Sequence, residues 1–108
     1  MGTLSTHVLD TTLGGPAAGI LVLLESLDGT SLADGVTDGD GRVATLGPER
    51  LEPGDYRLRF ATGGYFAAAG RTGFYPEVVV VFTVADAAEH YHVPVLLSPF
   101  GYSTYRGS

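Results

Sequence analysis

The residues of this sequence whose types and spacing could carry chemistry are three histidines, His7, His90 and His92. An imidazole with an ordinary pKa of about 6.5 can accept and release a proton near neutral pH. His90 and His92 are two positions apart in a strand-like stretch, so their side chains are expected on the same face. Three imidazoles could instead bind one metal ion with an open position, as in catalytic zinc sites. An ordinary structural role for strand histidines is the third interpretation, and residue types alone leave all three open.

Other chemical motifs are absent or incomplete. The segment Asp38–Gly41 (DGDG) resembles part of a calcium loop, but Arg42 and Val43 occupy positions that need a ligand and a glycine, so it is interpreted as a turn. The segment Gly101–Tyr105 lacks the closing glycine of a nucleophile elbow. The carboxylates are scattered singly, which gives no support for a glycosidase pair.

The composition excludes several function classes. The 108 residues include no Cys, so there is neither a disulfide framework nor a thiolate site, and no Lys is available for Schiff-base chemistry. A formal net charge of −6 argues against a nucleic-acid partner, which needs a basic surface. No apolar run approaches the roughly 20 residues of a membrane span, and the first residues lack the features of a signal peptide. We therefore expect a cytoplasmic protein that binds neither nucleic acid nor membrane.

The elements that must position the histidines are predicted to be strands. Gly makes up 16 of the 108 residues, about twice its usual ~7% share, and Gly, Pro and Asp clusters recur at intervals of roughly ten residues. Eight short strand-like segments lie between these clusters, which is typical of a single all-β domain spanning residues 1–108. They are Ser5–Asp10, Gly19–Leu27, Ser31–Thr37, Arg42–Leu46, Asp55–Ala61, Glu77–Val84, His90–Ser98 and Tyr102–Arg106. The only helical candidate is Thr62–Gly70, with Gly70 as its C-terminal cap.

The run Val78–Phe82 is apolar at every position. A strand that is apolar on both faces is usually buried on both faces, whereas a small two-sheet sandwich leaves one face of each strand in water. Three interpretations are open: a partner subunit covers this strand, the strand is an aggregation hazard, or it is a central strand of high β propensity. The first interpretation predicts that Val78–Val84 lies near a contact between subunits.

Four segments of the chain together point to a family. The segments Ser5–Thr12 (STHVLDTT) and Gly15–Gly19 (GPAAG) closely resemble the opening of the transthyretin-related proteins that act as 5-hydroxyisourate hydrolases. The segment His90–Pro99 (HYHVPVLLSP) resembles the second signature of that family. The chain ends in Tyr105–Ser108 (YRGS), the tetrapeptide that marks the enzyme and that transthyretin, the hormone carrier, lacks.

The resemblance implies a fold, an assembly and a reaction. The fold would be all-β, a prealbumin-like (transthyretin-like) sandwich of two four-stranded sheets with one short helix. The assembly would be a homotetramer, a dimer of dimers, with active sites in a channel between the dimers. The reaction would be hydrolysis of 5-hydroxyisourate to 2-oxo-4-hydroxy-4-carboxy-5-ureidoimidazoline in urate degradation.

The resemblance also implies which residues act. His7, Arg42, His92 and Ser108 match the catalytic positions of the family, and His7, Arg42 and Tyr105 match substrate contacts. The resemblance implies neither a metal nor a cofactor. These residue types suit the reaction, because Arg offers a planar fork of donors to a carbonyl-rich ring and His can move protons near neutral pH. The residues themselves do not indicate which histidine is the base.

Two alternatives to this metal-free hydrolase remain. One is a transthyretin-like protein that binds a small ligand in the same channel without turning it over. The other is a zinc hydrolase that uses the three histidines. The histidines and the terminal tetrapeptide favour catalysis over binding, and metal analysis of the purified protein separates the two hydrolases.

Overall fold

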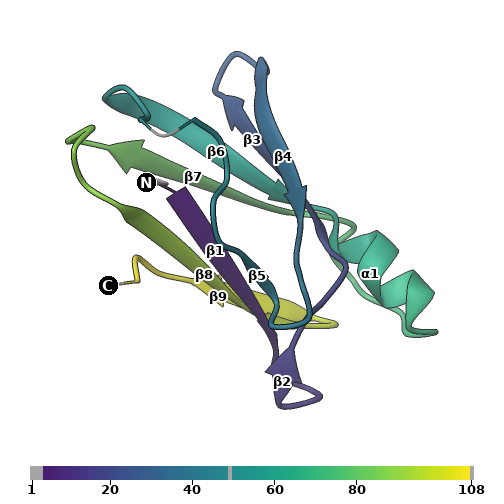
Figure 1. The fold of residues 1–108 in the computed structure, drawn as a ribbon. Helices are drawn as coiled ribbons and strands as arrows, with labels where there is room; N and C mark the ends of the chain where they lie inside the picture. The colour runs from purple at the N-terminus through teal and green to yellow at the C-terminus, as the bar shows by residue number, and fades with distance from the viewer. Residues whose placement is uncertain (1–3, 49, 108) are drawn as a thin grey trace.

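Two β-sheets packed face to face, with one short helix, make up residues 4–48 and 50–107, the part of the chain that the computed structural model describes (Figure 1). The all-β sandwich predicted from the turn spacing is confirmed. Each of the eight predicted strands has a counterpart, and two residues near the first turn add a further short strand, β2 (Gly15–Pro16).

The first sheet, called sheet A below, has the strand order β2-β1-β8-β9, and β5 also pairs with β1. Its two central strands, β1 and β8, are parallel and join the two ends of the chain. Their register places Ser5 opposite His92 and His7 opposite Pro94. The sheet therefore unites the two segments that carry the histidines. The bounds of its four main strands are Leu4–Asp10 (β1), Arg42–Val43 (β5), Tyr91–Ser98 (β8) and Gly101–Thr104 (β9).

The second sheet, sheet B, is wholly antiparallel and has the order β4-β3-β6-β7. Strand β6 shows the predicted alternation, because Leu58 and Phe60 are buried while Arg57 and Arg59 lie on the outer face. Inward apolar side chains of both sheets form one core, to which Phe66 of the helix also contributes. The bounds of the strands are Leu21–Ser26 (β3), Ser31–Val36 (β4), Gly54–Phe60 (β6) and Val78–Val84 (β7).

Strand β7 differs from one of the sequence interpretations. Among the residues that the structure describes, it pairs only with β6 and so forms an edge of sheet B, which makes the central-strand interpretation wrong. Its side chains alternate, with Val78 and Val80 in the core and Val79 and Val81 exposed at 40% and 60%. High β propensity explains the uniform run of valines, because β-branched side chains suit both faces of an extended strand.

The helix α1 (Thr62–Ala68) lies where the sequence predicts it, between β6 and β7. Gly70 has a φ of 70° and follows the C-cap residue Ala69, as expected of a glycine that ends a helix. None of the helices in the described residues is long and apolar enough to cross a membrane.

A buried carboxylate ties the helix to sheet A. Asp10 at the end of β1 is fully buried and accepts hydrogen bonds from the Tyr65 hydroxyl, at 2.7 Å, and from the Arg71 guanidinium. Burial raises the pKa of Asp10, but the hydrogen bonds from Arg71 and Tyr65 outweigh this and leave the pKa below its usual range. The Asp10 side chain also caps the following turn, where it accepts from the backbone N–H groups of Thr12 and Leu13.

Candidate active site

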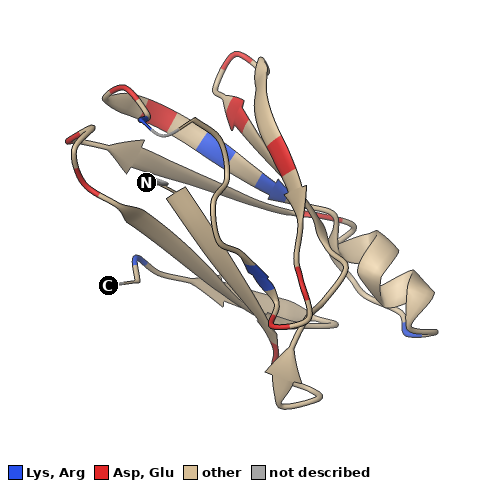
Figure 2. Cartoon of the chain, in the orientation of Figure 1, with Lys and Arg blue, Asp and Glu red and all other residues tan. Residues whose placement is uncertain are grey.

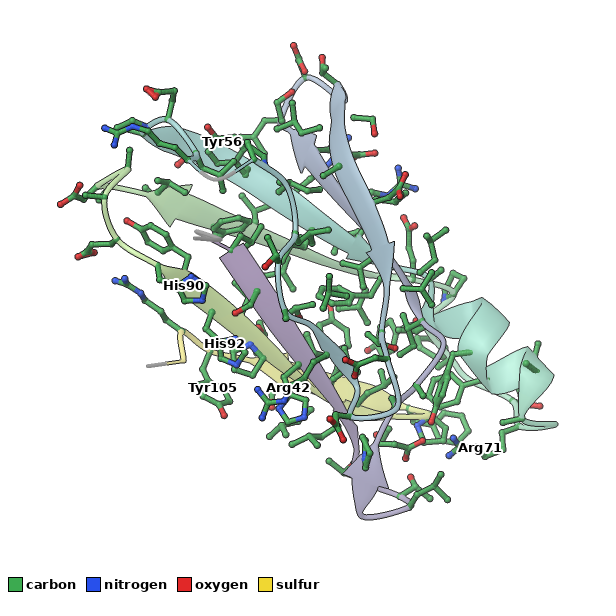
Figure 3. The ribbon with its side chains drawn as sticks, viewed as in Figure 1. Arg42, Tyr56, Arg71, His90, His92 and Tyr105 are labelled. Atoms are coloured by element: carbon green, nitrogen blue, oxygen red, sulfur yellow. The ribbon has the colours of Figure 1, made fainter. Side chains whose placement is uncertain are left out.

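The outer face of sheet A gathers the side chains that the sequence singled out. Within a strand, alternate residues share a face, and residues paired across strands lie on the same side. His7 pairs with Arg42 of β5, and Ser5 pairs with His92 of β8. Ser5 and His7 share the outward side of β1, so all four side chains belong to one face. Figure 3 shows Arg42, His90, His92 and Tyr105 on the same side of the ribbon, far from Arg71.

A tight turn presents Arg42 to this face. The Asp38 carboxylate accepts hydrogen bonds from the backbone N–H groups of Asp40 and Arg42, at 2.8 and 3.1 Å. Gly41 has a φ of 74°, and a Cβ there would lie 2.4 Å from the Val8 carbonyl oxygen, so only glycine fits. The segment interpreted as a turn is therefore a turn, and it positions Arg42 beside His7.

A cavity of about 260 Å³ lies on this face. It is small and open, and polar side chains from three strands and the turn before β8 reach it. Its lining residues are Ser5, Thr6, Arg42, Ala44, His90 and His92. Of the four residues matched to catalytic positions, Arg42 and His92 line this cavity, and His7 lies next to Arg42 in the strand register. Ser108 lies outside the described residues.

Ser5 is a site residue that the sequence analysis missed. Its hydroxyl oxygen lies 2.8 Å from His92 Nδ1 and 2.9 Å from His90 Nε2, so one hydroxyl bridges two imidazoles. The signal was present as two matching spacings, because Ser5 stands two positions before His7 as His90 stands two before His92. To infer from these spacings that Ser5 contacts the histidines, one must know the parallel register of β1 and β8, which no local sequence pattern reveals.

His92 has a perturbed acidity. Its pKa is lowered below the ordinary value, first by burial and then by the positive charges of Arg42, His7 and His90. A hydrogen bond with the Ser5 backbone acts in the opposite direction, but it is the weaker effect. His92 is therefore neutral at neutral pH, with a lone pair available to accept a proton.

The C-terminal tail folds back onto His92. The backbone N–H of Gly107 donates a 2.8 Å hydrogen bond to the carbonyl oxygen of His92. A Cβ at position 107 would lie 2.5 Å from Cδ2 of the His92 ring, so the tail approaches the ring as closely as only glycine permits. The predicted strand Tyr102–Arg106 is wrong in its last two residues, since β9 ends at Thr104 and the tail then crosses to β8.

Two further tail residues take different roles. The Arg106 guanidinium lies over the Tyr91 ring at 4.5 Å and forms a 3.2 Å ion pair with Glu89, which anchors the tail. Tyr105 is 57% exposed and lies on the rim of a second cavity rather than in the cavity lined by Arg42. Its position next to the site leaves its ring free to contact a ligand above the sheet.

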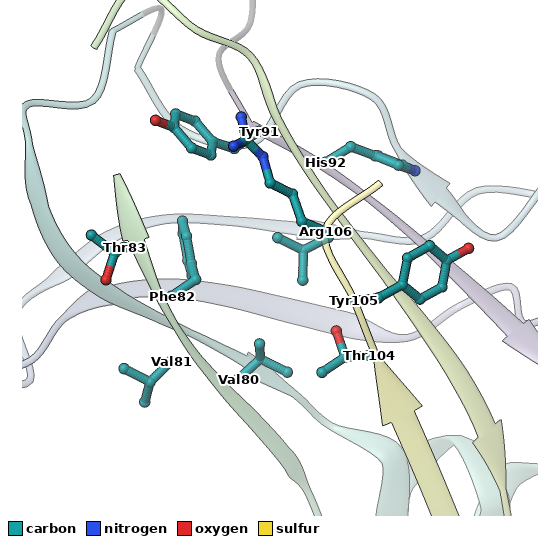
Figure 4. Close-up of a pocket in the computed structure, with 10 residues that line it drawn as sticks. Val80, Val81, Phe82, Thr83, Tyr91, His92, Thr104, Tyr105 and Arg106 are labelled. Atoms are coloured by element: carbon teal, nitrogen blue, oxygen red, sulfur yellow. The ribbon is translucent and has the colours of Figure 1, made fainter. Parts of the chain in front are cut away.

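That second cavity, of about 330 Å³, lies between strand β7 and the tail, and we call it the edge cavity (Figure 4). Its lining is mostly apolar and comes from β7, the start of β8 and residues 104–106. His92 borders both cavities, so the backbone of β8 and the tail separate an apolar hollow from a polar one.

The three histidines do not form a metal centre in this structure. Among residues 4–48 and 50–107, no three His, Cys, Asp or Glu side chains lie in an arrangement that could hold a metal ion. His90 and His92 instead direct ring nitrogens at the Ser5 hydroxyl. The arrangement with three imidazoles around one zinc is not formed.

Comparison with known proteins gives consistent matches over the whole described chain. The model of the HIUase/Transthyretin family matches residues 4–107. A 5-hydroxyisourate hydrolase of Salmonella dublin is 50% identical over 109 residues, which cover 97% of this chain and 80% of that protein.

Solved structures agree with this match. The structure of Klebsiella pneumoniae 5-hydroxyisourate hydrolase aligns with a TM-score of 0.91 and 43% identity, covering 99% of this chain and 100% of that one. Sea bream transthyretin in complex with thyroxine aligns with a TM-score of 0.90 and 34% identity, covering 97% and 94% of the two chains. The sandwich is thus shared by an enzyme and by a protein that binds thyroxine.

Proposed function

The chain belongs to the HIUase/Transthyretin family, and from this premise we propose that it hydrolyses 5-hydroxyisourate. The product would be 2-oxo-4-hydroxy-4-carboxy-5-ureidoimidazoline, in urate degradation. The observation that carries the proposal is the pairing of a neutral, half-buried His92 with the Arg42 guanidinium in one cavity. Such a pair supplies a base and a cationic donor, the two groups that ring opening by water needs.

The first step is attack of water on a ring carbonyl carbon. His92 removes a proton from the water as the C–O bond forms, which its lowered pKa permits because the neutral imidazole is present at neutral pH. Arg42 donates hydrogen bonds to the carbonyl oxygen and stabilises the negative charge that develops there. The ion-pair geometry supports this role, because Arg42 forms no ion pair with any carboxylate of the described residues.

The second step is cleavage of the C–N bond. The leaving nitrogen takes a proton from an imidazolium, either His92 or the neighbouring His7, and the ring opens to a carboxylic acid and an N–H group. We assign Tyr105 to contact with the substrate, because it stands on the rim beside His92. Ser108 is assigned as a further catalytic residue on the family match alone.

We propose a homotetramer, a dimer of dimers, with the outer face of sheet A turned toward a channel. Supporting it, β7 has an unpaired edge within the described residues and carries exposed Val79 and Val81. A sheet edge of this kind is usually covered. Sedimentation of the wild-type protein tests the assembly, and an active monomer would contradict it. Val80 is unsuitable as a probe of the interface because it is 8% exposed and faces the core, so Val80→Asp would unfold the chain.

Ligand binding without catalysis is the second candidate. The likeness to a thyroxine-bound transthyretin and the apolar edge cavity favour it. However, a carrier has no need for an imidazole of lowered pKa beside an unpaired guanidinium. The catalytic proposal is therefore preferred.

The test generates 5-hydroxyisourate from urate in situ and follows its decay by absorbance. Added protein should accelerate the decay, before and after exhaustive chelation, because no metal takes part in the proposed steps. Decay at the rate seen without protein would refute the proposed function. Loss of activity on chelation, restored by zinc, would instead favour the zinc hydrolase.

A further inference from the structure

The Ser5 hydroxyl occupies an unusual position between two imidazoles. Its oxygen is within hydrogen-bond distance of His92 Nδ1, at 2.8 Å, and of His90 Nε2, at 2.9 Å. Ser5 is 9% exposed and belongs to a paired strand, so its backbone is fixed, whereas His90 is exposed at the start of β8. The bridge thus links an imidazole in water to one that is partly shielded from it.

A hydroxyl has one proton, so the two hydrogen bonds depend on each other. In one arrangement, His90 Nε2–H donates to Ser5, and Ser5 donates to His92 Nδ1. His92 then carries its own proton on Nε2. In the other, His92 Nδ1–H donates to Ser5, and Ser5 donates to His90 Nε2. His92 Nε2 is then unprotonated and can act as a base.

We propose that Ser5 is a positioning residue that couples the two histidines, so that the protonation of His90 decides which ring nitrogen of His92 carries the proton. The inference rests on the proposed function, in which His92 acts on substrate and Ser5 and His90 do not touch it. When His90 gains a proton, its Nε2–H must donate to Ser5, and only the first arrangement remains. His92 is then held in the form that cannot accept a proton at Nε2.

The same bridge can move charge away from the reacting ring. When His92 Nε2 takes a proton from water, the Nδ1–H bond can break as a Ser5 O–H bond forms. The original Ser5 O–H bond then breaks as an Nε2–H bond forms on His90. The excess proton is then held on His90. When the same two transfers run in reverse and return it to His92 Nδ1, His92 is an imidazolium whose Nε2–H protonates the leaving nitrogen. No proton is gained or lost along the chain of three residues.

Other charged and titratable groups surround this bridge and also bias it. They are His7 on β1, Arg42 on β5, Asp38 on the turn before β5, Tyr105 and Arg106 on the tail, and Glu89 before His90. His7 and Arg42 act on His92 through charge alone and favour its neutral form. A direct charge effect of His90 on His92 survives removal of the Ser5 hydroxyl, whereas a coupled change of tautomer does not. This difference makes the proposal testable.

The test measures the tautomer of His92 by ¹⁵N NMR of the ring nitrogens, in full-length protein without substrate. In the wild type, the proton of neutral His92 should shift from Nε2 toward Nδ1 as the pH rises through the titration of His90. In Ser5→Ala and in His90→Ala this shift should disappear. Thr62→Val is the matched control, since it removes a buried, hydrogen-bonded hydroxyl on α1 and should leave the shift intact.

Activity gives a second readout. Ser5→Ala should lower kcat about 10–100-fold with little change in KM, as expected when the partner that orients a working imidazole is lost. Ser5→Ala and His90→Ala should both remove the dependence of kcat on the protonation of His90 from the pH profile. The double variant should be no slower than Ser5→Ala, because both substitutions break one bridge.

A His92 tautomer that is insensitive to pH in the wild type, or that still shifts in Ser5→Ala, would overturn the proposal. So would additive losses of kcat in the double variant. If wild-type protein fails to hydrolyse 5-hydroxyisourate, the proposed function fails, while the NMR measurement still decides whether Ser5 couples the two rings.

Discussion

The outer faces of the two sheets use arginine in opposite ways. On sheet B, Glu25 accepts hydrogen bonds from Arg57, at 2.7 Å, and from Arg59, at 3.3 Å, and Arg59 also pairs with Glu77 at 2.9 Å. Figure 2 shows these positive and negative segments side by side on the β3 and β6 strands. The pKa of Glu25 lies below its usual range, mainly because Arg57 donates a hydrogen bond to its carboxylate. Charge on this face is matched.

On sheet A, Arg42 is not held in an ion pair, although backbone hydrogen bonds and then the charges of Arg42 and His7 lower the pKa of the neighbouring Asp38. Arg42 has no ion-pair partner in the described residues and stands beside His7, within the same face as His92. Burial first, and then the positive charges of Arg42, His7 and His90, disfavour protonation of His92 and keep its lone pair available. An arginine with a carboxylate partner stabilises a fold, whereas one left without a partner beside an imidazole is available to a substrate.

Among the substitutions considered, loss of the Arg42 guanidinium should have the largest effect on activity. Arg42→Ala should lower the rate of 5-hydroxyisourate hydrolysis about 10²–10³-fold, the loss expected when an oxyanion donor is removed. Its melting temperature should change little, because Arg42 is exposed. The control is Arg59→Ala on sheet B, which should keep the wild-type rate. Equal rates for both variants would contradict the distinction between the two faces.

Deletion of the C-terminal tail should have the next largest effect on the rate of hydrolysis. Deleting residues 105–108 removes the Gly107 hydrogen bond to His92, the Arg106 anchor and Tyr105. Hydrolysis should slow by about 100-fold or more, as expected when positioning groups are lost. The core lies earlier in the chain, so the truncated protein should remain folded. The melting temperature and the hydrolysis rate are measured together. A truncated protein that is folded and as fast as wild type would remove the tail from the site.

The pH dependence probes the shielded imidazole. In the proposed mechanism the neutral form of His92 is active and its pKa is lowered, so the acid limb of kcat/KM should have its midpoint below pH 6.5 in Ser5→Ala, where His90 no longer sets the His92 tautomer. In that acid limb the rate falls about tenfold for each pH unit. Folding stability should follow the same direction. The unfolded chain binds a proton with a pKa of about 6.5, so stability decreases as the pH falls below that value toward the lowered pKa of the folded state. In Ser5→Ala, an acid limb with its midpoint above pH 6.5 would exclude His92 as the base.

The smallest effect on activity is expected on sheet B. Glu25→Gln leaves Arg57 and Arg59 without their shared carboxylate, so the melting temperature should fall. The hydrolysis rate at a temperature where the variant is folded should equal that of wild type. A fall in rate without a fall in melting temperature would mean that sheet B also contributes to catalysis.

The sequence allowed most of the fold to be predicted, because turns and alternation are local properties. The segment Asp55–Ala61 alternates in the sequence and alternates in the structure. The run at Val78–Phe82 was harder to interpret, since five apolar residues give the same pattern for a central strand and for an edge strand with exposed valines. Which one forms depends on the position of the strand in the sheet, and that is not a local property.

In the candidate site, too, the features that depend on local sequence could be predicted and those that depend on strand pairing could not. The shared face of His90 and His92 follows from strand geometry, and the motif match identified Arg42. Ser5 could not be placed, because its contact with His92 spans 87 positions and exists only in the parallel pairing of β1 and β8. Gly107 approaches the His92 ring closely because the chain leaves the strand at Thr104 and crosses to β8, which is not a local property of the sequence.

We propose that Arg42 and the neutral His92, on the outer face of sheet A, open the ring of 5-hydroxyisourate. The most direct measurement compares the decay of freshly generated 5-hydroxyisourate in the presence of wild type, Arg42→Ala, His92→Ala and Arg59→Ala, each verified as folded. We predict rapid decay with wild type and Arg59→Ala, and decay close to the uncatalysed rate with the other two. Decay that is equally fast with all four proteins, or no faster with wild type than without protein, would contradict the account.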